Sequence, residues 1–169
     1  MVDTVTDHRV QGGQRCGCCV ITVSDTRTVE TDAGGDLVVD RLIAAGHEIL
    51  RREIIPDNPA PMIALLRECE SDTNVQAVLL TGGTGIACRD QTFDTVSGLL
   101  NKIIPGYGEL FRSLSYAEIG SATILSRTVG GLMSQTVVLT MPGSPKAVEL
   151  AMDKIIVPEL GHLVHEANK

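Results

Sequence analysis

Short apolar runs alternate with helical patterns along most of this chain, and no other feature constrains its fold as strongly. Apolar or β-branched runs indicate strands at residues 18–23, 48–55, 75–80 and 137–141. Helical spacing of apolar residues, ended by glycine or proline, indicates helices at residues 36–45, 61–69, 94–102, 109–114 and 144–157, with Pro158 starting a last short helix. Strands that alternate with helices pair in parallel. The sequence therefore predicts an α/β fold: a single three-layer domain with a mostly parallel sheet and helices on both faces.

Length and composition agree with one domain. The chain has 169 residues, of which 43% are hydrophobic, enough for one full core. Only two Tyr and two Phe are present, so the core must consist mainly of Val, Ile, Leu and Ala. Residues 1–15 are polar and lack the apolar stretch of a signal peptide. We expect them to form a flexible N-terminal tail, with the α/β domain at residues 16–169.

Charge and composition also exclude classes of partner. The net charge is −7 and aromatic residues are scarce, so we expect no nucleic-acid partner. No apolar run reaches the ~20 residues of a membrane span, so we expect no membrane partner. Five cysteines without a secretion signal indicate reduced thiols in a cytoplasmic protein. The Cys-x-x-Cys at 16–19 opens a strand, which favours a structural role over metal or redox chemistry.

Three loops follow the carboxyl ends of predicted strands, where parallel sheets hold their ligands. They span residues 24–35, 81–94 and 142–146. The second loop begins with the string TGGTG at 81–85, whose glycines let backbone N–H groups approach an anion closely. The string matches neither a P-loop nor the dinucleotide-binding fingerprint. A tight turn without a ligand is the alternative interpretation.

Two carboxylates lie just beyond these glycines. Asp90 and Asp94 are four residues apart, so a helix that begins by Asp90 places both on one face. Mg²⁺ is usually held by one or two protein carboxylates beside substrate phosphates. We therefore predict a Mg²⁺ site at Asp90 and Asp94. In the alternative interpretation, Asp90 caps the helix and Asp94 stabilises its positive end.

The third loop is a Pro-Gly-Ser-Pro-Lys turn at 142–146. Ser144 as N-cap and Pro145 at the first helical position begin a helix, whose free N–H groups attract anions. Lys146 in the first turn is unfavourable for the helix alone, which indicates an anion nearby. A helix start signal followed by a solvated lysine is the alternative interpretation.

Longer strings carry these motifs. They read T-G-G-T-G-x-x-x-R-D-x-T from residue 81, P-G-Y-G-E-L-F-R-x-L-S-Y-x-E-I-G from residue 105, L-S-R-x-x-G-G from residue 125 and M-P-G-S-P-K-A-V from residue 141. Together they resemble the MogA/MoaB family of molybdopterin adenylyltransferases. The string at 105–120 is more similar to the MoaB branch. The resemblance runs from a V-S-D-T-R opening near Ser24 to the neighbourhood of Leu160.

The resemblance implies a MogA-like fold and an enzyme of molybdenum cofactor biosynthesis. The implied reaction is the MgATP-dependent adenylylation of molybdopterin, which gives adenylyl-molybdopterin and pyrophosphate. ATP and molybdopterin are then the substrates, Mg²⁺ is the cofactor, and a molybdate-inserting protein is the downstream partner. Because such proteins form trimers, sometimes paired into hexamers, we expect a homo-oligomer.

Residue roles follow from the same resemblance. Asp90 matches the acidic residue most tied to catalysis, through Mg²⁺, and Asp57 matches the family's other prominent aspartate. Nucleotide or pterin binding is implied for Ser24, Asp25 and Asp32, for Thr81, Gly82, Gly83, Thr84, Gly85 and Arg89, and for Pro142, Gly143 and Ser144.

Three positions depart from the family pattern. The first loop reads D-A-G-G at 32–35 where the family has D-x-S-G, so a hydroxyl is missing. Phe93 stands where proline is common, and Asp94 where glutamate is common. The missing hydroxyl favours an alternative function, a non-catalytic molybdopterin-binding or scaffold protein of the same fold. The intact Arg89-Asp90 pair favours an active enzyme.

Three of the four aromatic residues fall within residues 106–120, namely Tyr107, Phe111 and Tyr116. Aromatic residues concentrated in one stretch suggest the core of a subunit interface. A local core beneath that segment is the alternative interpretation.

Overall fold

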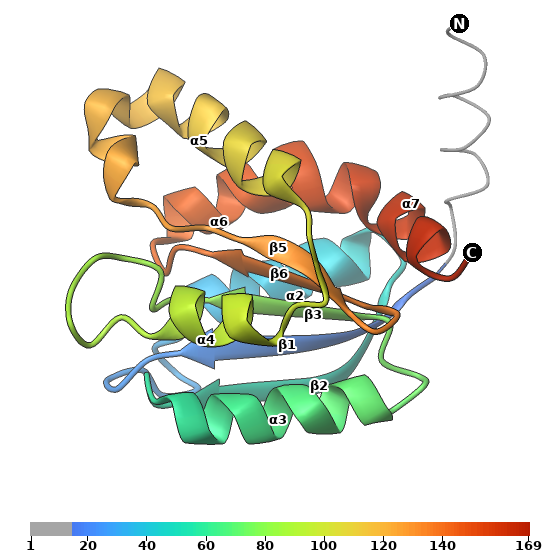
Figure 1. The fold of residues 1–169 in the computed structure, drawn as a ribbon. Coiled ribbons are helices and arrows are strands. Elements are labelled where there is room, and N and C mark those ends of the chain that lie inside the picture. The colour runs from blue at the N-terminus through green and yellow to red at the C-terminus, as the bar shows by residue number, and fades with distance from the viewer. Residues whose placement is uncertain (1–14) are drawn as a thin grey trace, which may run out of the picture.

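A six-stranded sheet in the order β2-β1-β3-β6-β5-β4 divides the protein into layers (Figure 1). The structure is a computed structural model and describes residues 15–169. Strand β1 pairs in parallel with β2 and β3, and β3 pairs in parallel with β6, whereas β5 and β4 are antiparallel. The strands are β1 (Gly17–Val23), β2 (Glu48–Ile55), β3 (Ala77–Thr81), β4 (Lys102–Ile103), β5 (Gly130–Met133) and β6 (Thr136–Met141).

Helices cover both faces of this sheet, which confirms the predicted three-layer α/β domain. Helices α3 (Pro59–Ser71) and α4 (Thr92–Leu99) pack on one face, and the other helices pack on the opposite face. These are α2 (Ala33–Ala44), α5 (Pro105–Ile119), α6 (Pro145–Ala151) and α7 (Val157–Ala167), with the 3₁₀ segment η1 (Gly120–Leu125) after α5 and the π segment η2 (Met152–Ile156) after α6.

Alternating residues of the central strands divide the core into two clusters. Val20 and Leu79 face the side that carries α2, whereas Ile21 and Leu80 face α3. All four are almost completely buried, as expected for strands covered on both faces. Within residues 15–169, no helix has both the length and the apolar composition needed to cross a membrane.

The hairpin of β5 and β6 was not predicted from the sequence. Its turn places Ser134 at φ 51°, and its first strand begins with two glycines, which weaken any strand pattern. A Cβ at Gly130 would lie 2.8 Å from Cδ1 of Tyr107, so the glycine lets α5 approach the sheet closely. The short edge strand β4 pairs with β5 and was missed as well.

Several predicted helix boundaries were wrong. Helix α4 begins at Thr92 and ends at Leu99, and α5 is far longer than the predicted 109–114. The predicted helix at 144–157 ends its α-helical part at Ala151. The π segment η2 then precedes Pro158, which has no N–H to donate within an α-helical ladder.

Residues 15–19 contain one arginine and three cysteines. The tail predicted at residues 1–15 lies outside the described residues, except for Arg15, which pairs with Glu48 at 3.2 Å. Cys16, Cys18 and Cys19 are buried, and Cys18 and Cys19 are free thiols. Burial, with a smaller effect of Cys16, raises the pKa of the Cys18 thiol to about 12, which makes it a poor nucleophile.

The aromatic cluster divides between the core and the surface. Phe111 is 1% exposed, and the buried Tyr107 hydroxyl donates to the Thr140 carbonyl at 2.8 Å. Only Tyr116 is exposed. Two of the three aromatic residues therefore belong to this subunit's own core, because the glycine-containing strand β5 lets α5 pack close to the sheet.

Candidate functional site

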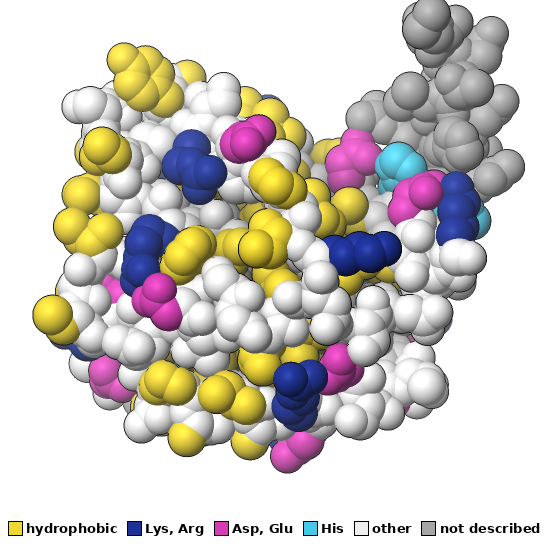
Figure 2. Space-filling view, viewed as in Figure 1, with side chains coloured by type: hydrophobic (Ala, Val, Ile, Leu, Met, Phe, Trp, Pro, Cys, Tyr) yellow, Lys and Arg dark blue, Asp and Glu magenta, His cyan; other side chains and the backbone are white. Residues whose placement is uncertain are grey.

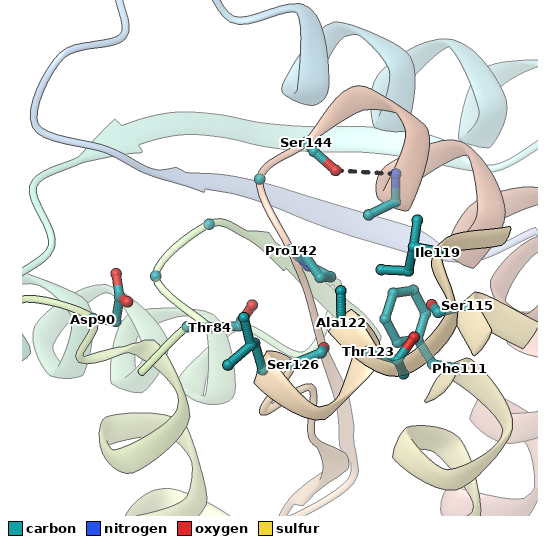
Figure 3. A pocket seen from close by; sticks show the side chains of 16 residues that line it. Thr84, Asp90, Phe111, Ser115, Ile119, Ala122, Thr123, Ser126, Pro142 and Ser144 are labelled. Carbon is teal, nitrogen blue, oxygen red and sulfur yellow. Dashed lines mark hydrogen bonds between the residues drawn. The ribbon is translucent and has the colours of Figure 1, made fainter. Parts of the chain in front are cut away.

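A cavity of about 390 Å³ lies between two strand-end loops and the α5–η1 segment (Figure 3). One loop follows β3 and the other follows β6, and these two strands are neighbours in the sheet. The carboxyl ends of both strands therefore meet at the cavity, as expected for a parallel sheet. Eight residues predicted from the sequence line it: Gly82, Gly83, Thr84, Gly85, Asp90, Pro142, Gly143 and Ser144.

The loop after β3 takes its shape from two glycines with positive φ. Gly82 has φ 101° and Gly83 has φ 64°, conformations that a β-carbon disfavours. A Cβ at Gly82 would lie 2.2 Å from the Val23 carbonyl oxygen, so the loop packs directly against the end of β1.

Asp57 stabilises the loop after β3 through hydrogen bonds. Its Oδ1 accepts from the Gln91 N–H at 3.0 Å, and its own N–H donates to Asp25 Oδ1 at 3.1 Å. A Cβ at Gly83 would lie 2.6 Å from Asp57 Oδ2. Burial, followed by the nearby charges of Asp90 and Asp25, raises the pKa of the Asp57 carboxyl. The carboxylates of Asp57, Asp90 and Asp25 therefore lie close to one another near the glycine loop.

Asp90 lines the cavity but does not belong to the following helix. Its Oδ2 accepts from the Ala87 N–H at 2.8 Å and would lie 2.6 Å from a Cβ at Gly85. Because α4 begins only at Thr92, the helix that would place Asp90 and Asp94 on one face does not form. Asp90 is not the helix cap either, since Gln91 holds that position, although the Gln91 side chain accepts no N–H of the helix.

A shallow depression lies next to the cavity, and both Asp90 and Asp94 border this depression. Both oxygens of the Asp94 carboxylate accept from Nη1 of Arg127, at 3.1 and 2.9 Å. The neighbouring Arg89 is exposed, and its charge opposes the rise in the pKa of Asp57 without cancelling it.

The turn after β6 touches the glycine loop. Thr81 Oγ1 donates to the Pro142 carbonyl at 3.1 Å, and a Cβ at Gly143 would lie 3.3 Å from the Gly82 Cα. Ser144 is the N-cap of α6, as predicted, with its Oγ accepting from the Ala147 N–H at 3.3 Å (Figure 3). Lys146 is exposed and borders a different groove.

The first loop, after β1, stays outside the cavity lining. Asp32 is 2% exposed and accepts from the Gly35 N–H, from Thr22 Oγ1 and from Arg52 Nη2 at 3.0, 2.7 and 3.1 Å. Ser24 Oγ accepts from two N–H groups of its own loop. The structure thus does not bring Ser24 and Asp32 to the predicted residues of the cavity, whereas Asp25 Oδ1 accepts from the Asp57 N–H.

The opposite wall of the cavity escaped sequence reasoning. Figure 3 shows Phe111, Ser115 and Thr123 gathered at one end of the cavity and Asp90 at the other. Phe111, Ser115 and Ile119 recur every four residues of α5, and this spacing was a usable signal. The Thr123 hydroxyl is buried and has no hydrogen-bond partner in the described part of the chain.

Arg127 is a further residue that could not be found from the sequence. Its guanidinium donates from Nε to the Gly85 carbonyl at 2.8 Å and from Nη2 to the Asp90 carbonyl at 3.0 Å. It also lies over the Phe93 ring, 5.0 Å from the centroid. The only signal was its place in the L-S-R-x-x-G-G string, which assigns no role.

Comparison with known proteins identifies the family. Residues 19–162 match a family described as a probable molybdopterin binding domain. The Molybdenum cofactor biosynthesis protein B of Bacillus subtilis is 48% identical over 168 residues, which cover 98% of both chains. The protein belongs to the MoaB/MogA family of molybdenum cofactor biosynthesis proteins. The match includes all three strand-end loops, so the cavity is part of the family's domain.

Solved structures of MoaB/MogA proteins have the same fold. The crystal structure of a Molybdenum cofactor biosynthesis protein B is 46% identical, with a TM-score of 0.89 over 92% of this chain and 98% of the other. The tungsten cofactor synthesizing protein MoaB from Pyrococcus furiosus is 32% identical, with a TM-score of 0.83 over 92% of this chain and 99% of the other. These names agree with the resemblance of residues 105–120 to the MoaB branch.

Proposed function

We propose that this MoaB/MogA protein is a nucleotidyltransferase that transfers AMP from MgATP to the terminal phosphate of molybdopterin and releases pyrophosphate. The observation that carries the proposal is the convergence of the glycine loop, Asp90 and the turn after β6 on one cavity. Nucleotidyl transfer needs positioning and charge neutralisation rather than a protein nucleophile, because the substrate's own phosphate attacks.

The two ends of the cavity suit two parts of the substrates. At the loop end, the Gly82 N–H already donates to the Met141 carbonyl, but the backbone N–H groups of residues 83–85 can bind phosphate oxygens. At the other end, Phe111 provides an apolar surface, while Ser115 and the unpartnered Thr123 hydroxyl can hydrogen-bond a heterocycle. We therefore propose that the phosphates lie at the glycines and that a ring system lies against α5 and η1.

Mg²⁺ fits the carboxylates at the loop end. Among residues 15–169, no three His, Cys, Asp or Glu residues gather as a metal cluster. Mg²⁺ does not require one, since one or two carboxylates together with substrate phosphates hold it. We propose that Asp90, supported by Asp57, holds the ion, which would neutralise phosphate charge. Asp94 is a less direct ligand, because Arg127 already engages both its oxygens.

Pyrophosphate release tests the reaction directly. The purified protein, MgATP and molybdopterin are incubated together, and pyrophosphate is measured against reactions that lack the pterin or contain a chelator in place of Mg²⁺. We expect release only in the complete mixture. Pyrophosphate that appears without the pterin, or none in any mixture, contradicts the proposal.

The alternative, a binding or scaffold protein without turnover, is favoured by Gly34. A Cβ at this position would lie 3.6 Å from the Gly143 carbonyl oxygen and 3.8 Å from Thr81 Oγ1. A serine there would place a hydroxyl where the two loops of the cavity meet. If the protein binds molybdopterin without releasing pyrophosphate, and Gly34→Ser starts turnover, the alternative is correct for the natural chain.

We further propose that the protein forms a homo-oligomer, a trimer or a pair of trimers. Hydrophobic side chains gather on the surface over α5 and η1 (Figure 2), where Tyr116, Ile119, Ile124 and Leu125 are all at least 50% exposed. Burying them between subunits would remove apolar area from water. Light scattering should give a multiple of 18.0 kDa, and a monomer at micromolar concentration contradicts this proposal.

The step that follows this reaction can be inferred from the chemistry of its product. The product would be an activated pterin phosphate, so we propose that a molybdate-inserting protein consumes it.

We assign the reaction to the cytoplasm, where buried free thiols such as Cys18 and Cys69 remain reduced.

A further inference from the structure

We infer that Arg127 is a positioning residue that holds the loop between β3 and α4 in the shape the site requires, and that Asp94 acts through it. The kinetic part of this inference rests on the proposed function, whereas its structural part does not. Arg127 lies in the segment between η1 and β5, far in sequence from the loop that it holds.

Arg127 contacts three residues of this loop and one residue of the following helix. Its backbone N–H donates to the Thr84 carbonyl at 3.0 Å. Its Nε and Nη2 donate to the carbonyls of Gly85 and Asp90, which lie at the start and near the end of the loop. Its Nη1 donates to Asp94 in α4. One side chain thus ties the two ends of the loop to each other and to the following helix.

Other hydrogen bonds hold the two ends of the loop, because the Gly82 N–H donates to the Met141 carbonyl and the Thr92 N–H donates to the Gly83 carbonyl, both at 3.0 Å. Residues 82–91 contain no helix or strand, and three of them are glycines. Between these ends, Ala87 and Asp90 are joined in both directions. Gln91 donates from Nε2 to the Cys88 carbonyl and from its N–H to Asp57 Oδ1. Without Arg127, the carbonyls of Gly85 and Asp90 would lose the charged donor that spans them. Hydrogen bonds to a charged donor are stronger than neutral ones.

The charge and plane of the guanidinium explain why arginine suits this position. A guanidinium donates in several fixed directions within one plane, whereas a lysine ammonium acts as a point charge. Here the plane lies over the Phe93 ring, and Asp94 neutralises the charge. Phe93 and Asp94 are two of the positions that depart from the family pattern. We infer that the side chains of both residues orient the Arg127 guanidinium.

The contacts of Arg127 influence where Asp90 lies in the site. The Asp90 carbonyl accepts from Arg127, while its carboxylate packs against Gly85 and lines the cavity. Holding the carbonyls of both residues sets where that carboxylate lies relative to the glycine N–H groups. A displacement of about 1 Å at such a site can cost on the order of 10²-fold in rate.

Hydrogen exchange tests the structural part without any substrate. In Arg127→Ala, the amides of Ala87, Asp90 and Thr92 should exchange faster, while the α6 amide of Val148 stays unchanged. Arg41→Ala is the matched control, because its guanidinium also pairs with carboxylates, those of Asp153 and Glu149, but far from the loop. Unchanged exchange of the loop amides in Arg127→Ala overturns the inference.

Kinetics and rescue test the positioning role. We expect kcat of Arg127→Ala to fall on the order of 10²-fold, with a smaller change in KM, and Arg127→Lys to recover only part of it. Ethylguanidinium, at concentrations too low to denature, should restore turnover of Arg127→Ala, whereas ethylammonium should not. Normal turnover in Arg127→Ala, or equal rescue by both cations, overturns the positioning role. If the wild type makes no pyrophosphate, the proposed function fails, and the exchange result still decides the structural part.

Discussion

The loops after β1 and β3 leave neighbouring parallel strands at the same edge of the sheet, yet they use their acidic residues in opposite ways. In the first loop, the Asp32 carboxylate accepts three hydrogen bonds from its own subunit and is almost fully buried. In the second, Asp90 accepts one backbone N–H and lines the cavity. A carboxylate whose oxygens already accept hydrogen bonds within the protein stabilises the fold. A carboxylate that faces a cavity and accepts fewer such bonds can bind a ligand.

The backbone of the two loops differs in the same way. In the first loop, the Gly35 N–H is capped by the Asp32 side chain at the start of α2. The glycine loop instead holds Gly82 and Gly83 at positive φ beside an open cavity. The comparison therefore predicts that changes in the first loop affect stability and that changes in the second affect ligand binding.

The largest expected effect is that of Asp90→Asn. The substitution keeps the shape of the side chain and an acceptor for the Ala87 N–H but removes the charge proposed to hold Mg²⁺. Turnover should fall about 10²–10³-fold, as for other lost electrostatic contacts in active sites, with the melting temperature unchanged. Pyrophosphate release at the wild-type rate would show that Asp90 is not the metal-binding carboxylate.

Asp32→Ala should produce the reverse pattern. Removing this carboxylate leaves the Gly35 N–H without its cap and Arg52 without its buried partner. The free energy of unfolding should fall by about 3 kcal/mol, while ATP affinity of the folded protein changes little. Urea denaturation and calorimetry measure the two quantities. Lost affinity with full stability would place Asp32 in the ligand site after all.

Gly83→Ala sharpens the comparison, because it should affect both quantities. A side chain at Gly83 could be expected to point into the space of the ligand, because Gly83 lines the cavity. In the structure its Cβ would instead meet Thr92 Oγ1 at 2.2 Å and Asp57 Oδ2 at 2.6 Å. Positive φ alone costs about 1–2 kcal/mol, so stability should fall by at least that amount, together with ATP affinity. A variant of unchanged stability would contradict this geometry.

The smallest expected effect is the pH dependence linked to Asp57. Burial and nearby carboxylates raise its pKa in the folded state above its ordinary value of 3.8. The folded state therefore binds this proton more tightly than the unfolded state, and stability falls as pH rises from 3.8 through the raised pKa. Asp57→Asn should flatten this part of the profile in denaturation at pH 3–6. An identical slope in both proteins would exclude Asp57 as its source.

Much of the fold could be predicted because its signals are local. The apolar runs at β1, β3 and β6 and the N-cap at Ser144 specify their own structure. The hairpin of β5 and β6 could not be predicted, because Gly130 serves a close tertiary approach to Tyr107 rather than strand propensity.

The site divides in the same way. Eight cavity residues were found because they occupy strand-end loops, whose place at the edge of a parallel sheet follows from topology. Phe111, Thr123 and Arg127 reach the site from α5, η1 and the segment after η1, and only tertiary packing brings them there. The role of Asp94 was hidden for the same reason, since its partner Arg127 is 33 residues away.

Calorimetric titration of ATP, with and without Mg²⁺, tests the contrast between the two loops most directly. The wild type and Asp32→Ala, the latter under conditions where it remains folded, should both bind ATP more tightly when Mg²⁺ is present. In Asp90→Asn this gain should disappear, while binding without Mg²⁺ persists. If Asp90→Asn keeps the full Mg²⁺ gain, or if Asp32→Ala loses it, the assignment of metal binding to the loop after β3 is contradicted.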